Sequence, residues 1–240
     1  MQQEEWFHRA VIYQVDSSLF YDANGDGFGD LAGIRQKLHY IRSLGATVLW
    51  LTPFYLTPLQ DDGYDISDHL QPDPRFGTIA DVIELIARAR ELGFFAVAHA
   101  GEEGPPEYIW QALDLLHVSR IDHGVRAEEE PRLMQRLISS GMPLTVCPLS
   151  NLKLRVVDNM QSHNLRRMLR QGVCVTVNSD DPAYFGGYIN ENFTVLIEAL
   201  ALNKADIVQL CRHSFSASWL PEAEKQRRYT EIEAIAAQFE

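Results

Sequence analysis

Hydrophobic and polar positions follow two alternating periods along most of the chain. Stretches with apolar residues three or four positions apart, typical of amphipathic helices, are followed by short apolar runs rich in β-branched residues. Leu31, Ile34, Leu38 and Ile41 form one such helical stripe. We expect strands in the apolar runs, at residues 10–15, 46–51, 94–98, 120–123, 144–147 and 173–177.

The helices expected between these runs have recognisable ends. Thr78 is a predicted N-cap, and Gly93, Gly141 and Gly172 stand where a left-handed C-cap would end a helix. The segment 221–240 predicts one or two closing helices. Strands that alternate with helices predict an α/β fold, a TIM-barrel-derived parallel sheet with surrounding helices. A closed barrel has eight strands and about six are recognisable here, so we expect a recombined or incomplete barrel.

Composition narrows the classes of function. The 240 residues include 21 Lys and Arg against 33 Asp and Glu, which gives a net charge of −12. A negative field repels phosphate backbones and anionic lipids, so we expect no nucleic-acid and no membrane partner. The first residues lack the pattern of a signal peptide, and Cys147, Cys174 and Cys211 suit reduced core thiols rather than disulfides. We therefore expect a cytoplasmic protein.

A glycine-rich segment at residues 21–30 places oxygen atoms at alternate positions. Asp22, Asn24, Asp26 and Asp30, with the main-chain carbonyl of Phe28, suit a hard cation such as Ca²⁺ or Mg²⁺. The segment is not a complete EF-hand, because a glycine occupies the position of the bidentate glutamate. The alternative interpretation is a surface turn held by Asx hydrogen bonds.

Four further motifs accompany this loop in the first half of the chain: Trp6-Phe7, Ala10–Val15, Leu49–Phe54 and Asp61–Asp68. Together they resemble the alpha-amylase superfamily, with trehalose synthase and oligo-1,6-glucosidase as the most similar branch. The resemblance extends from about Trp6 to the region of Thr78. It implies a divalent-ion site in the loop and a sugar-pocket remnant at Asp62, Tyr64 and Asp65.

The catalytic carboxylates of that superfamily are missing. Retaining glycosidases need two carboxyl groups about 5 Å apart. In this superfamily they lie in a Gly-x-Arg-x-Asp motif and in a downstream glutamate, and the motif does not occur in the sequence. We therefore expect no glycosidase activity.

Histidine and acidic residues gather behind the predicted strands of the second half. His99 and Glu102 follow one strand, His123 ends the next, and Asp180 and Asp181 follow the last. Because the carboxyl ends of parallel strands meet at one edge, these residues predict a metal-assisted hydrolytic site. The alternatives are that a strand-end histidine is a hydrogen-bonded core residue and that paired carboxylates cap a helix. Such features at successive strand ends favour the functional interpretation.

Four motifs carry these residues: His99–Pro106, Arg120–Gly124, Thr145–Asn151 and Val177–Gly186. They resemble the adenosine/adenine deaminase family, and the Ser-Asp-Asp-Pro-Ala-Tyr-Phe form is more similar to the adenine deaminase branch. The resemblance covers about Arg88 to the C-terminus, which corresponds to the latter half of that family's barrel.

This second resemblance implies a role for each matching residue. His99 and Asp180 would ligate Zn²⁺, and Glu102 would protonate the purine ring nitrogen. His123 would orient or deprotonate the attacking water, and Asp181 would hold the base. Zinc lowers the pKa of bound water toward about 7, which makes hydroxide available for attack on the purine.

The sequence departs from the deaminase family at the first strand. The family's other two zinc ligands form a His-x-His pair there, and no such pair occurs in this chain. His8 precedes the predicted strand, His39 lies in a predicted helix and His69 follows the second strand in a loop, whereas Asp16 is better placed. A catalytic zinc usually takes three protein ligands and the resemblance identifies two, so we expect an impaired site.

The two resemblances divide the chain into residues 1–86 and 87–240. We interpret these segments as alpha-amylase-like and adenine-deaminase-like half-barrels of a chimera that together form one barrel-like domain. Open sheet edges would allow a second copy to pair into a homodimer. Three hypotheses follow: a zinc-dependent deaminase of a small purine with an impaired site, a catalytically inactive recombined scaffold, and a calcium- or sugar-binding remnant of an alpha-glucosidase.

Overall fold

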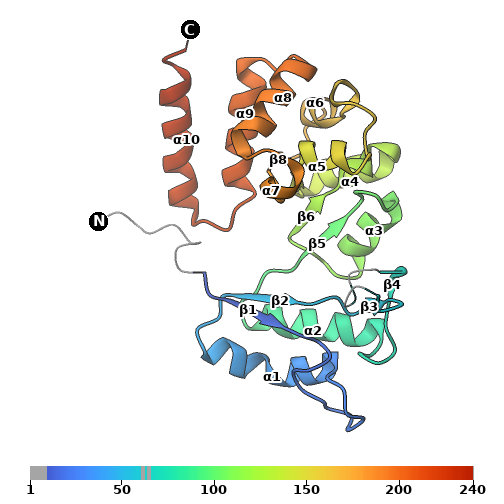
Figure 1. Ribbon diagram of the computed structural model, residues 1–240. Coiled ribbons are helices and arrows are strands. Elements are labelled where there is room, and N and C mark those ends of the chain that lie inside the picture. The colour runs from blue at the N-terminus through green and yellow to red at the C-terminus, as the bar shows by residue number, and fades with distance from the viewer. Residues whose placement is uncertain (1–9, 61–62, 64–65, 240) are drawn as a thin grey trace. The chain divides into compact units, whose positions relative to one another are not determined.

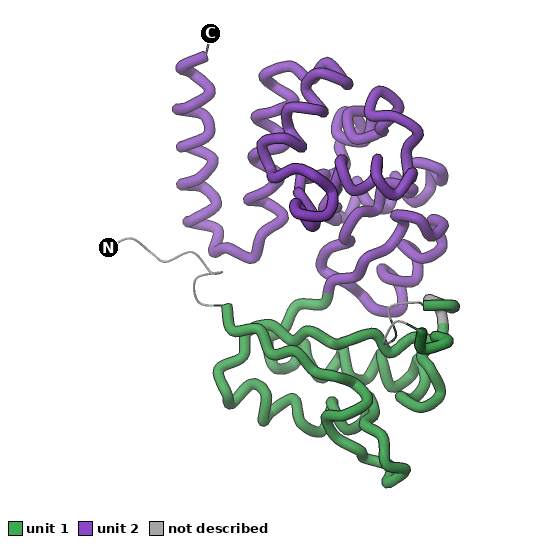
Figure 2. The backbone as a smooth tube through the Cα atoms, viewed as in Figure 1, with its two compact units in different colours: residues 1–96 green, residues 97–240 purple. Residues whose placement is uncertain are grey.

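The computed structural model describes residues 10–60, 63 and 66–239. The chain forms two compact units, residues 1–96 and residues 97–240 (Figure 2). The predicted motif Trp6-Phe7 and the sugar-pocket residues Asp62, Tyr64 and Asp65 lie outside the described residues.

The first unit pairs two parallel strands that are connected by a helix (Figure 1). β1 (Ile12–Val15) lies beside β2 (Val48–Leu51), and α1 (Leu31–Ser43) connects them. All four apolar residues of the predicted α1 stripe are fully buried, so the helical period of the sequence marks the face that packs inward. The side chain of Asp30 begins α1 by accepting a hydrogen bond from the amide of Gly33.

An antiparallel strand pair and a second helix complete this unit. β3 (Tyr55–Leu56) pairs with β4 (Asp68–Pro72), and α2 (Ile79–Glu91) packs against α1. α2 begins at the predicted N-cap Thr78, which forms a capping box. The predicted join between residues 86 and 87 falls inside α2, and the division of the chain at that point stays a prediction.

The second unit is built on a four-stranded parallel sheet whose strands follow one another in sequence order (Figure 1). The strands are β5 (Val97–Ala100), β6 (Arg120–His123), β7 (Leu144–Val146) and β8 (Val175–Val177). The α-helices are α3 (Pro106–Asp114), α4 (Pro131–Ser140), α5 (Pro148–Lys153), α6 (Leu165–Arg170), α7 (Pro182–Phe185), α8 (Ile189–Leu200), α9 (Lys204–Ser216) and α10 (Glu222–Ala236). Two 3-10 helices, η2 (Val125–Glu129) and η3 (Met160–Ser162), lie between them. α9 packs against β8, and α10 packs against α9.

A row of aliphatic side chains crosses the middle of this sheet. Ile121, Leu144 and Val175 are neighbours in the strand register, and each has no exposed surface. Burying a side chain of this size contributes about 1.5–3 kcal/mol. The apolar row therefore fixes the strands whose carboxyl ends carry the polar residues described below.

Six parallel strands confirm the predicted α/β class and the expected number of recognisable strands. They form one two-stranded and one four-stranded sheet, and the strands of the described residues do not close into a barrel. β5 begins at Val97, three residues after the predicted start, whereas β6 has the predicted bounds. The β3–β4 pair and helices α8 and α9 are additions to the predicted elements.

Across the described residues, no helix combines the length and the apolar character that a membrane span requires. The cytoplasmic location, the lack of a nucleic-acid partner and the homodimer stay predictions.

Candidate active site

The carboxyl ends of β5, β6 and β8 carry the residues that the sequence singles out in the second half. In the register of β5 and β6, His99 lies opposite Asp122, and Ala100 lies opposite His123. Asp180 follows the last residue of β8 by three positions. Since all these strands are parallel, their polar ends come together at one edge of the sheet.

His123 stands at the centre of the site. Its side chain is 3 % exposed, and its Nε2 lies 3.1 Å from Nδ1 of His99. Its Nδ1 lies 3.1 Å from Oε1 of Glu102. This second contact is not aligned as a hydrogen bond, so the buried Nδ1 has no hydrogen-bond partner within the described structure. The side chain of His99, in contrast, is 73 % exposed.

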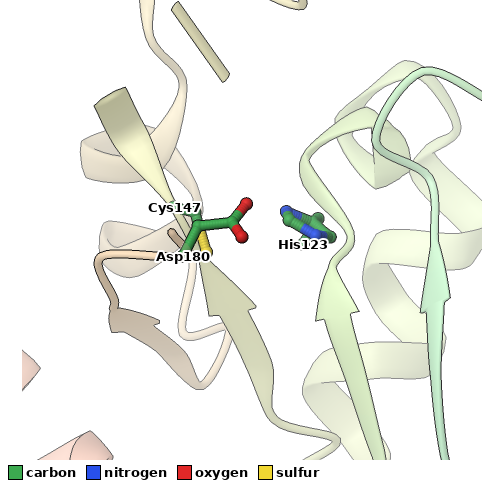
Figure 3. A group of neighbouring side chains, drawn as sticks. All are labelled: His123, Cys147 and Asp180. Carbon is green, nitrogen blue, oxygen red and sulfur yellow. The ribbon is translucent and has the colours of Figure 1, made fainter. Parts of the chain in front are cut away.

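His123, Cys147 and Asp180 form a group of possible metal ligands (Figure 3). One ligand atom from each lies within 4.8 Å of the others, and the carboxylate of Asp180 points toward the His123 ring. No other set of three or more His, Cys, Asp or Glu side chains comes this close among the residues that the structure describes. Cys147 is buried, as expected of a core thiol, but its place beside this group is not predicted from the apolar run around it. Its position directly after β7 is the signal that could have revealed it.

Burial and negative neighbours favour the neutral form of Glu102. Desolvation is the main cause, and the carboxylates of Asp180 and Glu103 add to it, so that the pKa of Glu102 rises to about 7. Hydrogen bonds from Asn151 Nδ2 at 3.1 Å and Ser150 Oγ at 3.5 Å act in the opposite direction. Glu102 can therefore carry a proton near neutral pH.

The same surroundings keep His123 uncharged. Burial and the neighbouring His99 lower the pKa of His123 to about 4, although the carboxylates of Asp180 and Asp122 act in the opposite direction. Burial also raises the pKa of the Cys147 thiol, and the nearby carboxylates add to this effect. The site thus combines a neutral imidazole with a carboxyl group that can carry a proton near neutral pH.

The backbone at this edge of the sheet is locally unusual. His123 and Asp180 have φ values of 69° and 57°, in the left-handed region that residues other than glycine rarely adopt. Gly101, between the two polar residues of its motif, has φ 65°, and a Cβ there would come 2.3 Å from Cδ1 of Ile109 in α3. Glycine is favoured at this position because its backbone is left-handed and because a Cβ would displace the Ile109 side chain.

Asp181 lies next to the site but acts as the N-cap of α7. Its Oδ1 accepts hydrogen bonds from the amides of Ala183 and Tyr184, both at 3.1 Å. This is the helix-cap arrangement weighed against a functional interpretation above. The predicted contact of Asp181 with a purine stays a prediction.

The glycine-rich loop of the first unit uses its polar side chains internally. Asp22 accepts hydrogen bonds from two glycine amides of the loop, Asn24 from the amide of Asp26, and Asp26 from the amide of Phe28. Asp30 is occupied as the cap of α1. These contacts agree with the surface-turn interpretation, and calcium or magnesium binding stays a prediction.

Two further residues weighed as metal ligands also have local partners in the first unit. Asp16 accepts hydrogen bonds from the amide and the hydroxyl of Ser18, and His39 contacts Arg88. Neither belongs to a group of three close ligand side chains among the described residues.

Parallel strands whose carboxyl ends bring together histidines, a partly buried glutamate and an aspartate are typical of the active-site edge of α/β enzymes. The model of the adenosine deaminase family matches residues 63–235, and the chain belongs to this family. The model of the alpha-amylase catalytic domain matches residues 14–99, which agrees with the first resemblance.

Relatives and solved structures extend this result. Adenine deaminase of Acinetobacter baylyi is 58% identical over 173 residues, which is 72% of this chain and 50% of the relative. The crystal structure of adenine deaminase from Arthrobacter aurescens superimposes with a TM-score of 0.72 at 33% identity, covering 95% of this chain and 62% of that chain. An amidohydrolase from Burkholderia ambifaria with bound Zn has a TM-score of 0.68 at 21% identity, over 95% of this chain and 58% of that one, which shows a shared fold. The chain spans about half the length of the first of these relatives.

Proposed function

We propose that the second unit carries a hydrolytic purine deaminase site, acting on adenine or adenosine, with reduced activity. The observation that carries the proposal is the meeting of His99, Glu102, Asp180 and the buried His123 at the ends of parallel strands. The adenine deaminases named above support the choice of a purine. In the reaction, water supplies an oxygen to the purine, the exocyclic amino group leaves as ammonia, and adenine becomes hypoxanthine.

Glu102 is the proton donor in this proposal. A purine ring nitrogen gains electron density as water adds to the neighbouring carbon, and a neutral carboxyl group can donate a proton to it. The pKa of about 7 keeps a large fraction of Glu102 protonated near neutral pH. General acid catalysis by a positioned side chain typically contributes about 10²- to 10⁴-fold to the rate.

His123 is the residue that orients the attacking water and accepts its proton. An imidazole can act as a base only while it is neutral, and the pKa of about 4 keeps His123 neutral throughout the physiological range. Its Nδ1, which is buried without a hydrogen-bond partner in the described structure, offers a free lone pair or proton at the site. Asp181, which borders this edge, would contact the base.

Zinc fits the donor set of this edge. Imidazole nitrogen, thiolate sulfur and carboxylate oxygen are the ligands that zinc takes in proteins, and all three kinds of donor occur together at this edge. His99 and Asp180 would hold the ion, and Cys147 lies close enough to Asp180 to add a third ligand. When bound, zinc supplies positive charge that makes water easier to deprotonate near neutral pH.

The proposal includes impairment because the His-x-His pair is missing from the sequence. Two measurements on the purified chain test it: metal analysis, and the change in ultraviolet absorbance as adenine is converted to hypoxanthine in the presence of added zinc. We expect stoichiometric zinc and slow conversion. No turnover at micromolar protein with zinc would instead favour the inactive recombined scaffold.

A pair of histidine variants locates the activity. We expect His99→Ala to abolish the conversion, and the matched control His39→Ala, which removes an exposed imidazole from α1, to retain it. Equal rates in the two variants would contradict the proposed role of His99.

A further inference from the structure

A chain of buried hydrogen bonds leads away from Glu102 through two polar side chains that the proposed reaction does not use. Asn151 donates from Nδ2 to Oε1 of Glu102 at 3.1 Å, and its Oδ1 lies 3.4 Å from Nε2 of His163. The amide of Leu165 donates to Nδ1 of His163 at 3.1 Å. Asn151 is 0 % exposed and His163 is 1 % exposed, so water does not compete for these contacts.

The start of α6 determines which nitrogen of His163 carries the proton. Leu165 is the first residue of α6, where backbone amides have no carbonyl partner within the helix. An amide N–H can only donate, so Nδ1 of His163 must accept and be unprotonated. A neutral imidazole with an unprotonated Nδ1 carries its proton on Nε2. Burial, together with the nearby Arg167, lowers the pKa of His163 to about 4, which agrees with a neutral ring.

The proton on Nε2 of His163 in turn orients the Asn151 amide. A donor at Nε2 must meet the oxygen of Asn151 rather than its nitrogen. The amide group of Asn151 then turns its N–H toward Glu102. The oxygen and nitrogen of the Asn151 amide are similar in size, so packing alone does not determine its orientation. The backbone amide of Leu165, fourteen residues further along the chain, determines it through His163.

Two donors converge on the same oxygen of Glu102. Asn151 Nδ2 and, at 3.5 Å, Ser150 Oγ both face Oε1. A protonated carboxyl group has one accepting and one donating oxygen, and an oxygen that faces donors is the accepting one. Nδ1 of His123 also lies 3.1 Å from Oε1 but is not aligned as a hydrogen bond, so both aligned contacts of Oε1 are donors and Oε2 is the oxygen left for proton exchange.

We propose that His163 is a positioning residue: through Asn151 it keeps an N–H donor on Oε1 of Glu102 and so fixes the orientation of this carboxyl group, with Oε2 available to the purine. The inference rests on the proposed function for its catalytic meaning. His163 itself touches neither substrate nor reacting atoms. Its effect resembles that of outer partners at other active sites, whose loss typically lowers activity about 10- to 100-fold.

The first test needs no activity. Nitrogen-15 NMR of the full chain labelled at histidine distinguishes the two neutral tautomers and the charged ring. We expect the signal that is lost in His163→Gln to belong to a neutral ring with its proton on Nε2 at pH 6. A proton on Nδ1, or a charged ring at that pH, would overturn the inference, even if the chain also proves inactive toward adenine.

The second test compares two substitutions in the adenine assay. Gln can place an N–H donor near the position of Nε2, whereas Leu cannot, so we expect His163→Leu to lower kcat about 10- to 100-fold with KM changed less than about threefold. We expect His163→Gln to restore kcat to within about threefold of the original chain. Equal rates in both variants would overturn the inference. If His163→Leu fails to fold, judged by circular dichroism, the NMR result and the rate of His163→Gln decide.

Discussion

The two compact units share an architecture but differ in where their polar side chains lie. Both contain parallel strands joined by helices with buried apolar faces, and both begin a helix with a capping box, at Thr78 in the first and at Asn203 in the second. In the second unit, polar side chains extend into the buried ends of strands, and the pKa values of Glu102, His123 and His163 depart far from their ordinary values. In the described part of the first unit, Asp22, Asp73 and Asp81 have lowered pKa values caused mainly by hydrogen bonds.

The partners of a polar group, rather than its presence or burial alone, separate the two units: Asp73 in the first unit is buried, but hydrogen bonds from Arg75 lower its pKa. In the loop 21–30, hydrogen bonds from the amides of Gly27 and Gly25 lower the pKa of Asp22 and favour its charged form. Glu102 receives hydrogen bonds from the side chains of Asn151 and Ser150, but desolvation and the nearby Asp180 carboxylate outweigh them and raise its pKa. Two hydrogen bonds to a carboxyl group therefore accompany a lowered pKa at Asp22 and a raised pKa at Glu102, where the raised pKa allows the group to donate a proton.

Matched glutamate substitutions test this comparison with the largest expected effect. Glu102→Gln removes the proton donor, and we expect kcat/KM for adenine to fall about 10²- to 10⁴-fold. Glu84→Gln in α2, which affects an exposed ion pair with Arg35 in the first unit, should leave the rate unchanged. The adenine absorbance assay checks both variants, and comparable losses would mean that the chemistry is not confined to the second unit.

Truncating one core side chain in each unit tests whether the two units unfold independently. Ile41→Ala in α1 and Leu137→Ala in α4 each remove a side chain with no exposed surface, and each should cost about 2–5 kcal/mol. We expect faster amide hydrogen exchange mainly in the unit that carries the substitution. Exchange followed by mass spectrometry checks this, and an equal loss of protection in both units would show that they unfold as one.

The pH dependence of stability should distinguish the units next. Glu102 has a folded pKa of about 7 against about 4.5 for the free side chain, so its folded form binds a proton over this interval. Its stabilising contribution is full below pH 4.5 and is lost as the pH rises through 7, by about 3 kcal/mol. Urea unfolding of metal-free protein should show this decline in the original chain and not in Glu102→Gln. His123 has a depressed pKa, so its contribution is lost in the opposite direction, as the pH falls from 6.5 through 4.

Removal of one helix N-cap in each unit should have the smallest effect on stability, and a similar effect in both units. Thr78→Ala in the first unit and Asn203→Ala in the second each remove a side chain that accepts the amide hydrogen bond of an Asp at the third helical position. Each should cost about 1 kcal/mol and leave adenine conversion unchanged. Denaturant midpoints check the pair, and a much larger loss for one of them would show that its helix supports more than its own first turn.

The elements of this fold could be predicted wherever one face of a regular element is buried. The stripe of α1 and the bounds of β6 both follow from local patterns in the sequence. Helices α8 and α9 were harder to predict because no apolar strand separates them, although Asn203 with Asp206 carries the signal of a capping box. The antiparallel pair β3–β4 depends on contacts across a segment of polar residues, which no period marks.

The site could be predicted in part. His99, Glu102, His123 and Asp180 stand at strand ends, and parallel pairing brings such positions together. Cys147 lies in an apolar run, where the sequence alone does not distinguish a core thiol from a metal ligand. The orientation of Asn151 depends on His163, and the link between Glu102 and Asn151 spans 49 positions in sequence, which only the tertiary structure reveals.

The turn behind His99 has a consequence for how this chain can change over time. The side chain of Ile109 occupies the space next to Gly101, so a methyl group added at the glycine would collide with it. Replacement of either residue alone meets a steric or a cavity penalty, whereas a smaller residue at 109 opens the room that an alanine at 101 would need. Random mutagenesis followed by selection should therefore recover changes at these two positions jointly, with the backbone twist at 101 limiting even the double replacement.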